Sequence, residues 1–322
     1  MRPCVFVPQP IHSDALHFLR RKARVVVGFG PDATAWTDGL ACADGIVLRT
    51  APFRKGDFEL AARLKVIARH GVGVDNVDLE EATRRGVAVV NTPLANVESV
   101  AEHALGCMLA LAKSICRGHD LTRRGGFTRR DELVGVELYG KTRGIVGFGR
   151  FGGVVARKCR AALGLRVLAF DPYRSAEEME AHGVEKVGEL GRLLAQADVI
   201  SVHVPLTEQT RGLIGRPELG LVKRGAFLLN LSRGGVVDEG ALVEALREGV
   251  VRGAAVDVFE EEPPPDDHPL FSLDNVVVTP HIAAHTEEAM RRMALEAAEA
   301  VVAFLEGRRP QHIVNPEALR DG

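Results

Sequence analysis

Several features are scarce or absent in this 322-residue chain, and each absence argues against a class of protein. Its 41 basic and 43 acidic residues nearly balance, so no excess charge favours nucleic acid or an acidic membrane as partner. Its five cysteines lack metal-ligand spacing and disulfide density, which indicates reduced thiols in the cytoplasm and no metal site. No apolar run is long enough to span a bilayer. We therefore expect a cytoplasmic globular protein without a membrane anchor.

Short apolar segments alternate with amphipathic ones along most of the chain. Segments such as Cys4–Val7, Gly45–Leu48 and Val66–Ala68 are typical of buried parallel strands joined by helices. Pro93 interrupts this alternation, and apolar residues at helical spacing then predict a long buried helix over Val97–Cys116. The length suggests about two domains. The sequence therefore predicts an α/β protein with two doubly wound parallel sheets.

The stretch from Lys141 to Gly152 is typical of a strand that enters a glycine-rich turn and then a helix. Gly147, Gly149 and Gly152 follow the G-x-G-x-x-G pattern, which permits a tight turn, close approach to a pyrophosphate and close helix packing. Asp171 ends the next apolar segment, 19 positions after Gly152, where a Rossmann unit has its ribose-binding acid. An aspartate there favours NAD over NADP, because its charge repels a 2′-phosphate.

Two other glycine pairs fit this pattern less well. Gly28 and Gly30 precede the segment Asp32–Gly39, which lacks an apolar helical face and predicts a surface loop. Gly71-Val-Gly73 also follows an apolar segment, but Asn76 stands at the position of the third glycine. We therefore expect one dinucleotide site, at Gly147–Gly152.

Three chemically capable residues, Arg233, Glu262 and His281, each follow a different predicted strand of the second half. Ligands of parallel sheets bind beyond the carboxyl ends of the strands, so these side chains are expected to converge. Arginine can bind a carboxylate with two hydrogen bonds, histidine exchanges a proton near neutrality, and a neighbouring carboxylate stabilises imidazolium. Taken singly, they could be a turn arginine, a solvated acid and a helix cap. The competing histidines are His70, His203 and His285.

These segments, in this order, resemble the motif series of the D-isomer-specific 2-hydroxyacid dehydrogenases. The matching segments are Gly71–Asn76, Val100–His103, Gly147–Gly152, His203–Thr210, Leu229–Asp238, Asp257–Pro263 and Thr279–His281. The resemblance implies a Rossmann NAD-binding domain, residues 98–285, inserted into a flavodoxin-like substrate domain of residues 1–97 and 286–322. It implies hydride transfer between NADH and a 2-oxo acid or D-2-hydroxy acid of the hydroxypyruvate, glyoxylate or 3-phosphoglycerate type.

The same resemblance implies residue roles. Arg233 would bind the substrate carboxylate and carbonyl, His281 would be the acid/base, and Glu262 would pair with His281. The implied cofactor-binding residues are Val100, Gly147, Gly149, Arg150, Phe151, Gly152, Asp171, His203, Val204, Pro205, Thr210, Leu231 and Asp257. The implied further substrate-binding residues are Arg49, Val72, Gly73 and Asn96. Arg49 resembles a phosphate-contacting arginine of phosphoglycerate dehydrogenases, although a strand-end arginine bound to the protein's own carboxylates is an equal alternative.

Similar proteins are homodimers that use the helix after residue 98 and the segment that follows it, here the glycine- and arginine-rich residues 117–140. Two alternatives stay open on the same scaffold. One is an NAD(H)-sensing binding protein like the corepressors that resemble this family, and the other is a phosphite-type dehydrogenase. Formate enzymes resemble the chain less, because they have glutamine where Glu262 stands.

Overall fold

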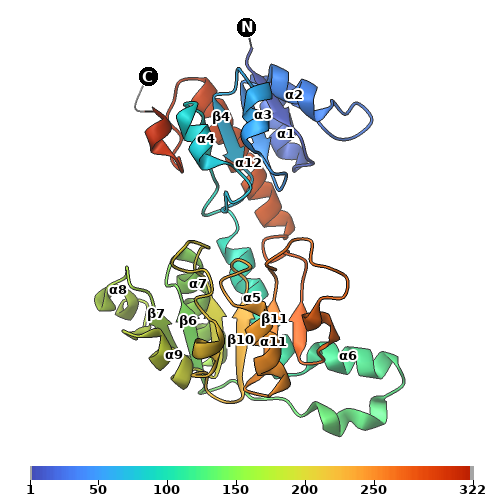
Figure 1. Ribbon diagram of the computed structural model, residues 1–322, viewed down its shortest axis with the longest axis vertical. Helices are drawn as coiled ribbons and strands as arrows, with labels where there is room; N and C mark the ends of the chain where they lie inside the picture. Colours follow the sequence, from blue (N-terminus) through green and yellow to red (C-terminus); the bar gives the residue numbers. More distant parts are fainter. Residues whose placement is uncertain (1, 320–322) are drawn as a thin grey trace. The chain divides into compact units, whose positions relative to one another are not determined.

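A computed structural model describes residues 2–319 of the chain. The chain folds as two compact units. One unit ends at Asn96 and resumes at His285, and the other runs from Val97 to Ala284. Both units consist of a parallel sheet with helices on its faces, as the alternation of apolar and amphipathic segments predicts (Figure 1).

The first unit contains a five-stranded parallel sheet with the order β2-β1-β3-β4-β5, the flavodoxin-like order. Its strands are β1 (Cys4–Val7), β2 (Arg24–Val27), β3 (Gly45–Leu48), β4 (Val66–Arg69) and β5 (Ala88–Val90). Its helices are α1 (Ser13–Lys22), α2 (Trp36–Cys42), α3 (Lys55–Leu60), α4 (Leu79–Arg84), α12 (Glu287–Leu305) and the 3-10 helix η3 (Pro316–Leu319).

The helix α12 brings the C-terminal part of the chain back into the first unit. Its buried face is rich in alanine, including Ala294, Ala297 and Ala298, and these small side chains let it pack beside α1, β3 and β4. A tail follows, in which Ile313 forms an antiparallel bridge to Val90. The N-terminal and C-terminal segments therefore share one hydrophobic core.

The second unit contains a seven-stranded parallel sheet with the order β12-β11-β10-β9-β6-β7-β8. Counted from β6, this is the Rossmann order 3-2-1-4-5-6 with one strand added. The strands are β6 (Thr142–Val146), β7 (Arg166–Phe170), β8 (Glu185–Lys186), β9 (Val199–Val202), β10 (Ala226–Asn230), β11 (Val251–Val256) and β12 (Val276–Val278). The strand order reverses between β6 and β9, where such folds bind their ligand.

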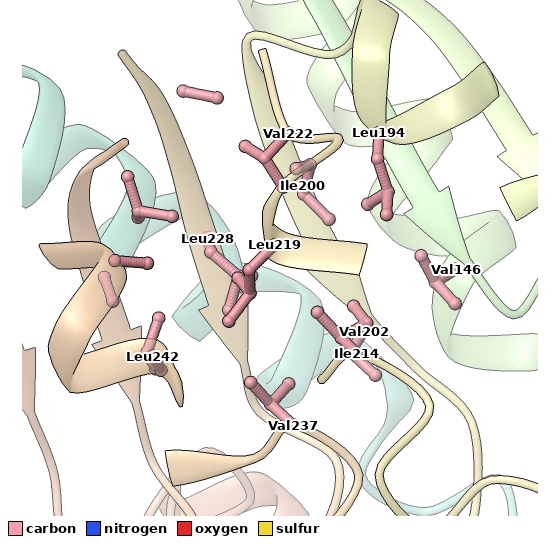
Figure 2. Packing of buried hydrophobic residues seen from close by; sticks show 14 of the residues in the cluster. Val146, Leu194, Ile200, Val202, Ile214, Leu219, Val222, Leu228, Val237 and Leu242 are labelled. Atoms are coloured by element: carbon pink, nitrogen blue, oxygen red, sulfur yellow. The ribbon is translucent and has the colours of Figure 1, made fainter. Parts of the chain in front are cut away.

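Helices cover both faces of this sheet. They are α5 (Val97–Ala112), α6 (Ile115–Arg123), α7 (Arg150–Leu163), α8 (Ala176–Glu180), α9 (Leu190–Gln196), α10 (Arg216–Leu219) and α11 (Glu239–Arg247), with the 3-10 helices η1 (Phe127–Leu133) and η2 (Pro269–Ser272). Figure 2 shows one layer, in which Leu194, Leu219 and Leu242 from α9, α10 and α11 pack with strand residues such as Ile200 and Leu228. On the other face α5 and α7 pack against each other and enclose a second core. The predicted fold class is confirmed.

Two local expectations need correction. The helix predicted to reach Cys116 ends at Ala112, because Ser114 takes a left-handed backbone conformation (φ 52°) and a new helix, α6, begins at Ile115. The segment 117–140 is therefore partly helical. The segment Asp32–Gly39 is not only a loop, since α2 begins at Trp36 and buries Leu40.

Among residues 2–319 no single helix is long and apolar enough to cross a membrane. The helices α5 and α6, which are bent by 60° relative to each other, reach that length and composition only when they are counted together.

Candidate active site

The turn between β6 and α7 requires glycine at two positions for reasons of the chain itself. Gly147 has a φ of 94°, and a Cβ atom there would lie 2.7 Å from Val204 Cγ1. A Cβ on Gly152 would lie 2.3 Å from the carbonyl oxygen of Gly147 and 3.0 Å from Ile145 Cγ2. These contacts explain the first and third glycines of the motif, which bring the start of α7 close to the end of β6.

Gly149 is different, because a Cβ atom there would meet no atom within 4 Å. Gly149 is the N-cap of α7, and no side chain caps the helix, so the first N–H groups of α7 are available to a ligand. Asp171 follows β7 and accepts hydrogen bonds from the backbone N–H groups of Phe148 (2.8 Å) and Tyr173 (2.9 Å). An open glycine, an uncapped helix start and a nearby carboxylate fit the pyrophosphate and ribose of NAD.

The other residues expected to bind cofactor lie mainly beyond the carboxyl ends of neighbouring strands of the same sheet. His203, Val204 and Pro205 follow β9, Leu231 follows β10, and Asp257 follows β11. The hydroxyl of Thr210 donates to the carbonyl of Pro205 at 2.6 Å, which fixes the loop after β9. Val100 lies in α5 and is buried.

Arg233 lies on a loop that approaches the segment after β11 very closely. A Cβ atom on the next residue, Gly234, would lie 1.8 Å from the carbonyl oxygen of Phe259, so only glycine allows this approach. The side-chain amide of Asn230 donates to the carbonyl of Arg233 at 3.0 Å and fixes the loop. The charge of Arg233 is near enough to help lower the pKa of Glu262. Close backbone packing beside Arg233 therefore explains the glycine at position 234.

His281 and Glu262 form a direct pair. Nδ1 of His281 lies 2.8 Å from Oε2 of Glu262, and the other carboxylate oxygen, Oε1, accepts from the N–H of Phe259 at 3.1 Å. Both side chains are partly exposed, at 48% and 39%. Burial would raise the pKa of Glu262, but hydrogen bonding to His281, the charge of His281, the Phe259 N–H and Arg233 together hold that pKa below its ordinary 4.5. Glu262 is therefore a carboxylate at neutral pH and leaves Nε2 of His281 for proton exchange.

The loop that carries His281 is held in a strained conformation by Asp257. His281 has a φ of 53°, which is unusual for a residue other than glycine. Asp257 is fully buried, and it accepts hydrogen bonds from the hydroxyl of Thr279 (2.6 Å) and the N–H groups of Ile282 (2.8 Å) and Ala283 (3.0 Å). These bonds flank His281 on both sides. The observed contacts of Asp257 thus shape the histidine loop, and its contact with a nicotinamide carboxamide stays a prediction.

Two of the competing histidines, His203 and His70, have lowered pKa values. Burial, and then the charge of Arg143, lowers the pKa of His203 to about 3. Burial, and then the charge of Arg49, lowers the pKa of His70 to about 4. Both are neutral at neutral pH, so neither can supply a proton as an imidazolium. The geometry favours His281 as the acid/base.

A cavity of about 300 Å³ adjoins the His281–Glu262 pair within the second unit. It is lined by Phe259, Glu262, Pro263, Pro264, Phe271, Val278, Thr279, Pro280 and His281. The other walls are mainly apolar, so the imidazole and the carboxylate line a largely hydrophobic cavity.

In the first unit, Arg49, Val72, Gly73 and Asn96 follow the carboxyl ends of β3, β4 and β5. The guanidinium of Arg49 donates to the carbonyl of Pro10 at 2.7 Å, and burial lowers its pKa. The carbonyl of Val72 accepts from the amide of Asn91 at 2.7 Å. Oδ1 of Asn96 is buried and has no hydrogen-bond partner among residues 2–319. Their role in substrate binding stays a prediction.

Several positioning contacts were not identified from the sequence. Nε2 of His103 lies 3.3 Å from the hydroxyl of Thr279 and extends the network of Asp257 into α5. Glu239, at the start of α11, accepts from the N–H of Glu260 (2.7 Å) and lies 3.0 Å from Nε2 of His268. No periodicity marks these residues, because each pair joins segments that are far apart in the chain.

Comparison with known proteins was made on sequence and on structure. Residues 105–283 match the NAD binding domain of the D-isomer specific 2-hydroxyacid dehydrogenases. The D-3-phosphoglycerate dehydrogenase of Methanocaldococcus jannaschii is 44% identical over 97% of this chain, which spans only 59% of that protein. The glyoxylate reductase of Korarchaeum cryptofilum is 42% identical over 99% of this chain and 98% of its own length.

Among solved structures, the D-lactate dehydrogenase of Aquifex aeolicus, in complex with NAD and lactic acid, has a TM-score of 0.85 and 29% identity. The match covers 97% of this chain and 99% of that one. Both units of the present chain are therefore included in the likeness.

Proposed function

Because the chain belongs to the D-isomer-specific 2-hydroxyacid dehydrogenase family, we propose that it is an NAD-dependent oxidoreductase that interconverts a small 2-oxo acid and a D-2-hydroxy acid. The observation that carries the proposal is the group formed by Arg233, Glu262 and His281. These residues lie at the carboxyl edge of a sheet whose glycine turn suits NAD. A cation, a proton carrier and a carboxylate beside that carrier are the groups this reaction needs.

In reduction, His281 acts from Nε2, because its Nδ1 is engaged with Glu262. It donates a proton to the carbonyl oxygen of the substrate as negative charge develops there. Arg233 binds the substrate carboxylate and stabilises the developing charge with preorganised N–H donors. NADH, which the Gly147–Gly152 turn and Asp171 would hold, would supply the hydride that the carbonyl carbon accepts. In oxidation His281 accepts the hydroxyl proton instead.

For the substrate we propose the 2-oxo acids of two or three carbons, glyoxylate, hydroxypyruvate and phosphohydroxypyruvate, because similar proteins are named for glyoxylate, for hydroxypyruvate and for 3-phosphoglycerate, the reduced form of phosphohydroxypyruvate. Arg49, Val72, Gly73 and Asn96 are proposed to contact the substrate. The partly buried guanidinium of Arg49 would suit an anionic distal group, although its bond to the carbonyl of Pro10 gives it a structural role as well.

The test is NADH consumption by the purified chain with glyoxylate, hydroxypyruvate, phosphohydroxypyruvate, pyruvate and branched 2-oxo acids. We expect turnover with at least one small acid, and a loss of about 10²- to 10⁴-fold in kcat for His281→Asn with little change in NADH binding. His17→Asn, an exposed histidine on α1, is the control and should keep full activity. NADH binding without turnover of any acid would contradict the proposed oxidoreductase activity and favour a nucleotide-sensing protein.

We propose that the chain acts as a homodimer through α5, α6 and the segment that follows. Large apolar side chains of this segment are exposed in the single chain: Ile115 (55%), Phe127 (68%), Val134 (73%) and Tyr139 (78%). Sedimentation should show a dimer, and Phe127→Asp should weaken it, whereas Leu60→Asp on α3 should not. A monomeric wild-type protein at micromolar concentration would refute this proposal.

We also propose that the protein is cytoplasmic, because its five cysteines are free thiols.

A further inference from the structure

Two cysteines of the first unit lie side by side, although they are 38 positions apart. Sγ of Cys4, on β1, lies 3.3 Å from Sγ of Cys42, the last residue of α2. A disulfide bond is about 2.05 Å long, so the two sulfur atoms need to approach by only about 1.3 Å. The thiol of Cys42 also donates to the carbonyl of Gly39 at 3.3 Å, which aims it at one place.

The proximity follows from how α2 packs on β1. A Cβ atom on Gly39 would lie 2.4 Å from the ring of Phe6, so glycine lets this helix approach the strand closely. Cys42 lies three residues after Gly39, on the same face of the helix, and Cys4 lies two residues before Phe6, on the same face of the strand. The contact that places Gly39 over Phe6 therefore places Cys42 over Cys4. The pair belongs to the core packing and not to a mobile loop.

The two thiols differ in access to solvent. Cys4 is buried, at 2% exposure, whereas Cys42 is partly exposed. Burial, and then the hydrogen bond and charge of Cys42, raises the pKa of Cys4 to about 12, with the nearby carboxylate of Asp44 acting in the same direction. Cys4 is therefore a protonated thiol that reagents in solution reach poorly, and Cys42 is the one that meets an oxidant first.

We propose that Cys4 and Cys42 are an oxidation site, at which hydrogen peroxide converts the two thiols into an intramolecular disulfide. Peroxide first transfers an oxygen to the sulfur of Cys42, which becomes a sulfenic acid as one water is released. The sulfur of Cys4 then bonds to that of Cys42 while the S–O bond breaks, and the proton of Cys4 leaves with the hydroxide as a second water. Two thiols are oxidised by two electrons in total, and one peroxide is reduced to two waters.

Mass spectrometry of the full chain tests the site. The protein is treated with hydrogen peroxide in its folded state, its remaining thiols are alkylated under denaturing conditions, and it is digested with trypsin without reduction. Residues 1–20 and 25–49 form two tryptic peptides with one cysteine each. We expect them as one linked species, about 2 Da lighter than their sum, that increases with peroxide and disappears with dithiothreitol.

Two variants provide the controls. Cys42→Ser should leave Cys4 fully alkylated after peroxide, because the accessible partner is gone. Cys116→Ser, which removes an exposed cysteine on α6, should leave the linked species unchanged. The proposal is overturned if Cys42 is converted to sulfinic acid while Cys4 is still alkylated, or if Cys4 is found linked only to Cys116.

Discussion

Replacing Gly152, Gly153 and Gly149 by alanine, one at a time, should give three different outcomes. In Gly152→Ala the new methyl group lies 2.3 Å from the carbonyl oxygen of Gly147, whereas ordinary contacts begin at 3.4 Å. The obstacle is backbone, so α7 has to move from β6 by about 1 Å. Overpacking of this kind costs about 1–3 kcal/mol of the free energy of unfolding.

Gly153→Ala is the matched control in the same helix. Its methyl group would meet only Phe148 Cζ, at 3.9 Å, which is ordinary van der Waals contact. Since alanine loses less backbone entropy than glycine in a helix, this variant should be more stable than the wild type by about 0.5–1 kcal/mol. Its NADH affinity should not change.

Gly149→Ala tests cofactor binding with little effect on the stability of the fold. No atom of the protein lies within 4 Å of the new methyl group, and glycine is favoured over alanine at an N-cap by less than about 1 kcal/mol. The methyl group nevertheless occupies the open space in which the pyrophosphate is expected. NADH affinity should fall at least about tenfold, which is about 1.4 kcal/mol of binding free energy.

Urea unfolding measures the stability of the three variants, and fluorescence titration measures their NADH affinity. Gly152→Ala should lose stability and Gly149→Ala should lose mainly affinity. If Gly152→Ala is as stable as Gly153→Ala, the close packing inferred for this turn is wrong. If Gly149→Ala binds NADH like the wild type, the pyrophosphate does not lie at this turn.

Three further substitutions test other parts of the structure. Glu262→Gln should lower kcat/KM about five- to tenfold at neutral pH and shift the alkaline limit of keto-acid reduction downward, because imidazolium loses its carboxylate; an unchanged pH profile argues against the pair. The wild type should have a higher kcat/KM with NADH than with NADPH, and Asp171→Ala should reduce that ratio. A wild-type preference for NADPH would overturn the assignment of NAD as the cofactor. Arg143→Leu should raise the free energy of unfolding, measured in urea, by about 1–3 kcal/mol, because the buried Nε and Nη2 of Arg143 lack hydrogen-bond partners among residues 2–319. A variant less stable than the wild type would contradict this reasoning.

The sheets could be predicted because each strand is marked by a run of apolar residues that are adjacent in the sequence. Apolar runs such as Val199–Val202 and Ala226–Asn230 are fully buried in the structure, as parallel strands require. The fingerprint Gly147–Gly152 is equally local, since a Cβ atom on Gly152 would meet Gly147 and Ile145, and one on Gly147 would meet the loop directly after the adjacent strand β9. Parallel strands also bring their carboxyl ends to one edge, and the convergence of loop residues follows from that topology.

The irregular segments could not be predicted, because their conformations depend on contacts that are remote in sequence. Trp36 begins a helix where the local pattern predicts a loop, and its indole N–H donates to the carboxylate of Asp57, 21 residues away, at 2.7 Å. The break between α5 and α6 depends on the left-handed conformation of Ser114, a residue with no strong preference for it. Arg143 breaks the apolar pattern of β6 and is nevertheless fully buried.

The segment after β11 shows why spacing alone could not reveal how the site is held together. Asp257 holds the loop on both sides of His281, the carbonyl of Phe259 lies against Gly234 next to Arg233, and Glu262 pairs with His281. Six consecutive residues thus contact both of the other catalytic loops. A movement of this segment would displace the cation and the proton carrier together, so the position of β11 sets the geometry of all three side chains. That coupling comes from backbone approaches within contact distance, which a pattern of residue types along the chain does not encode.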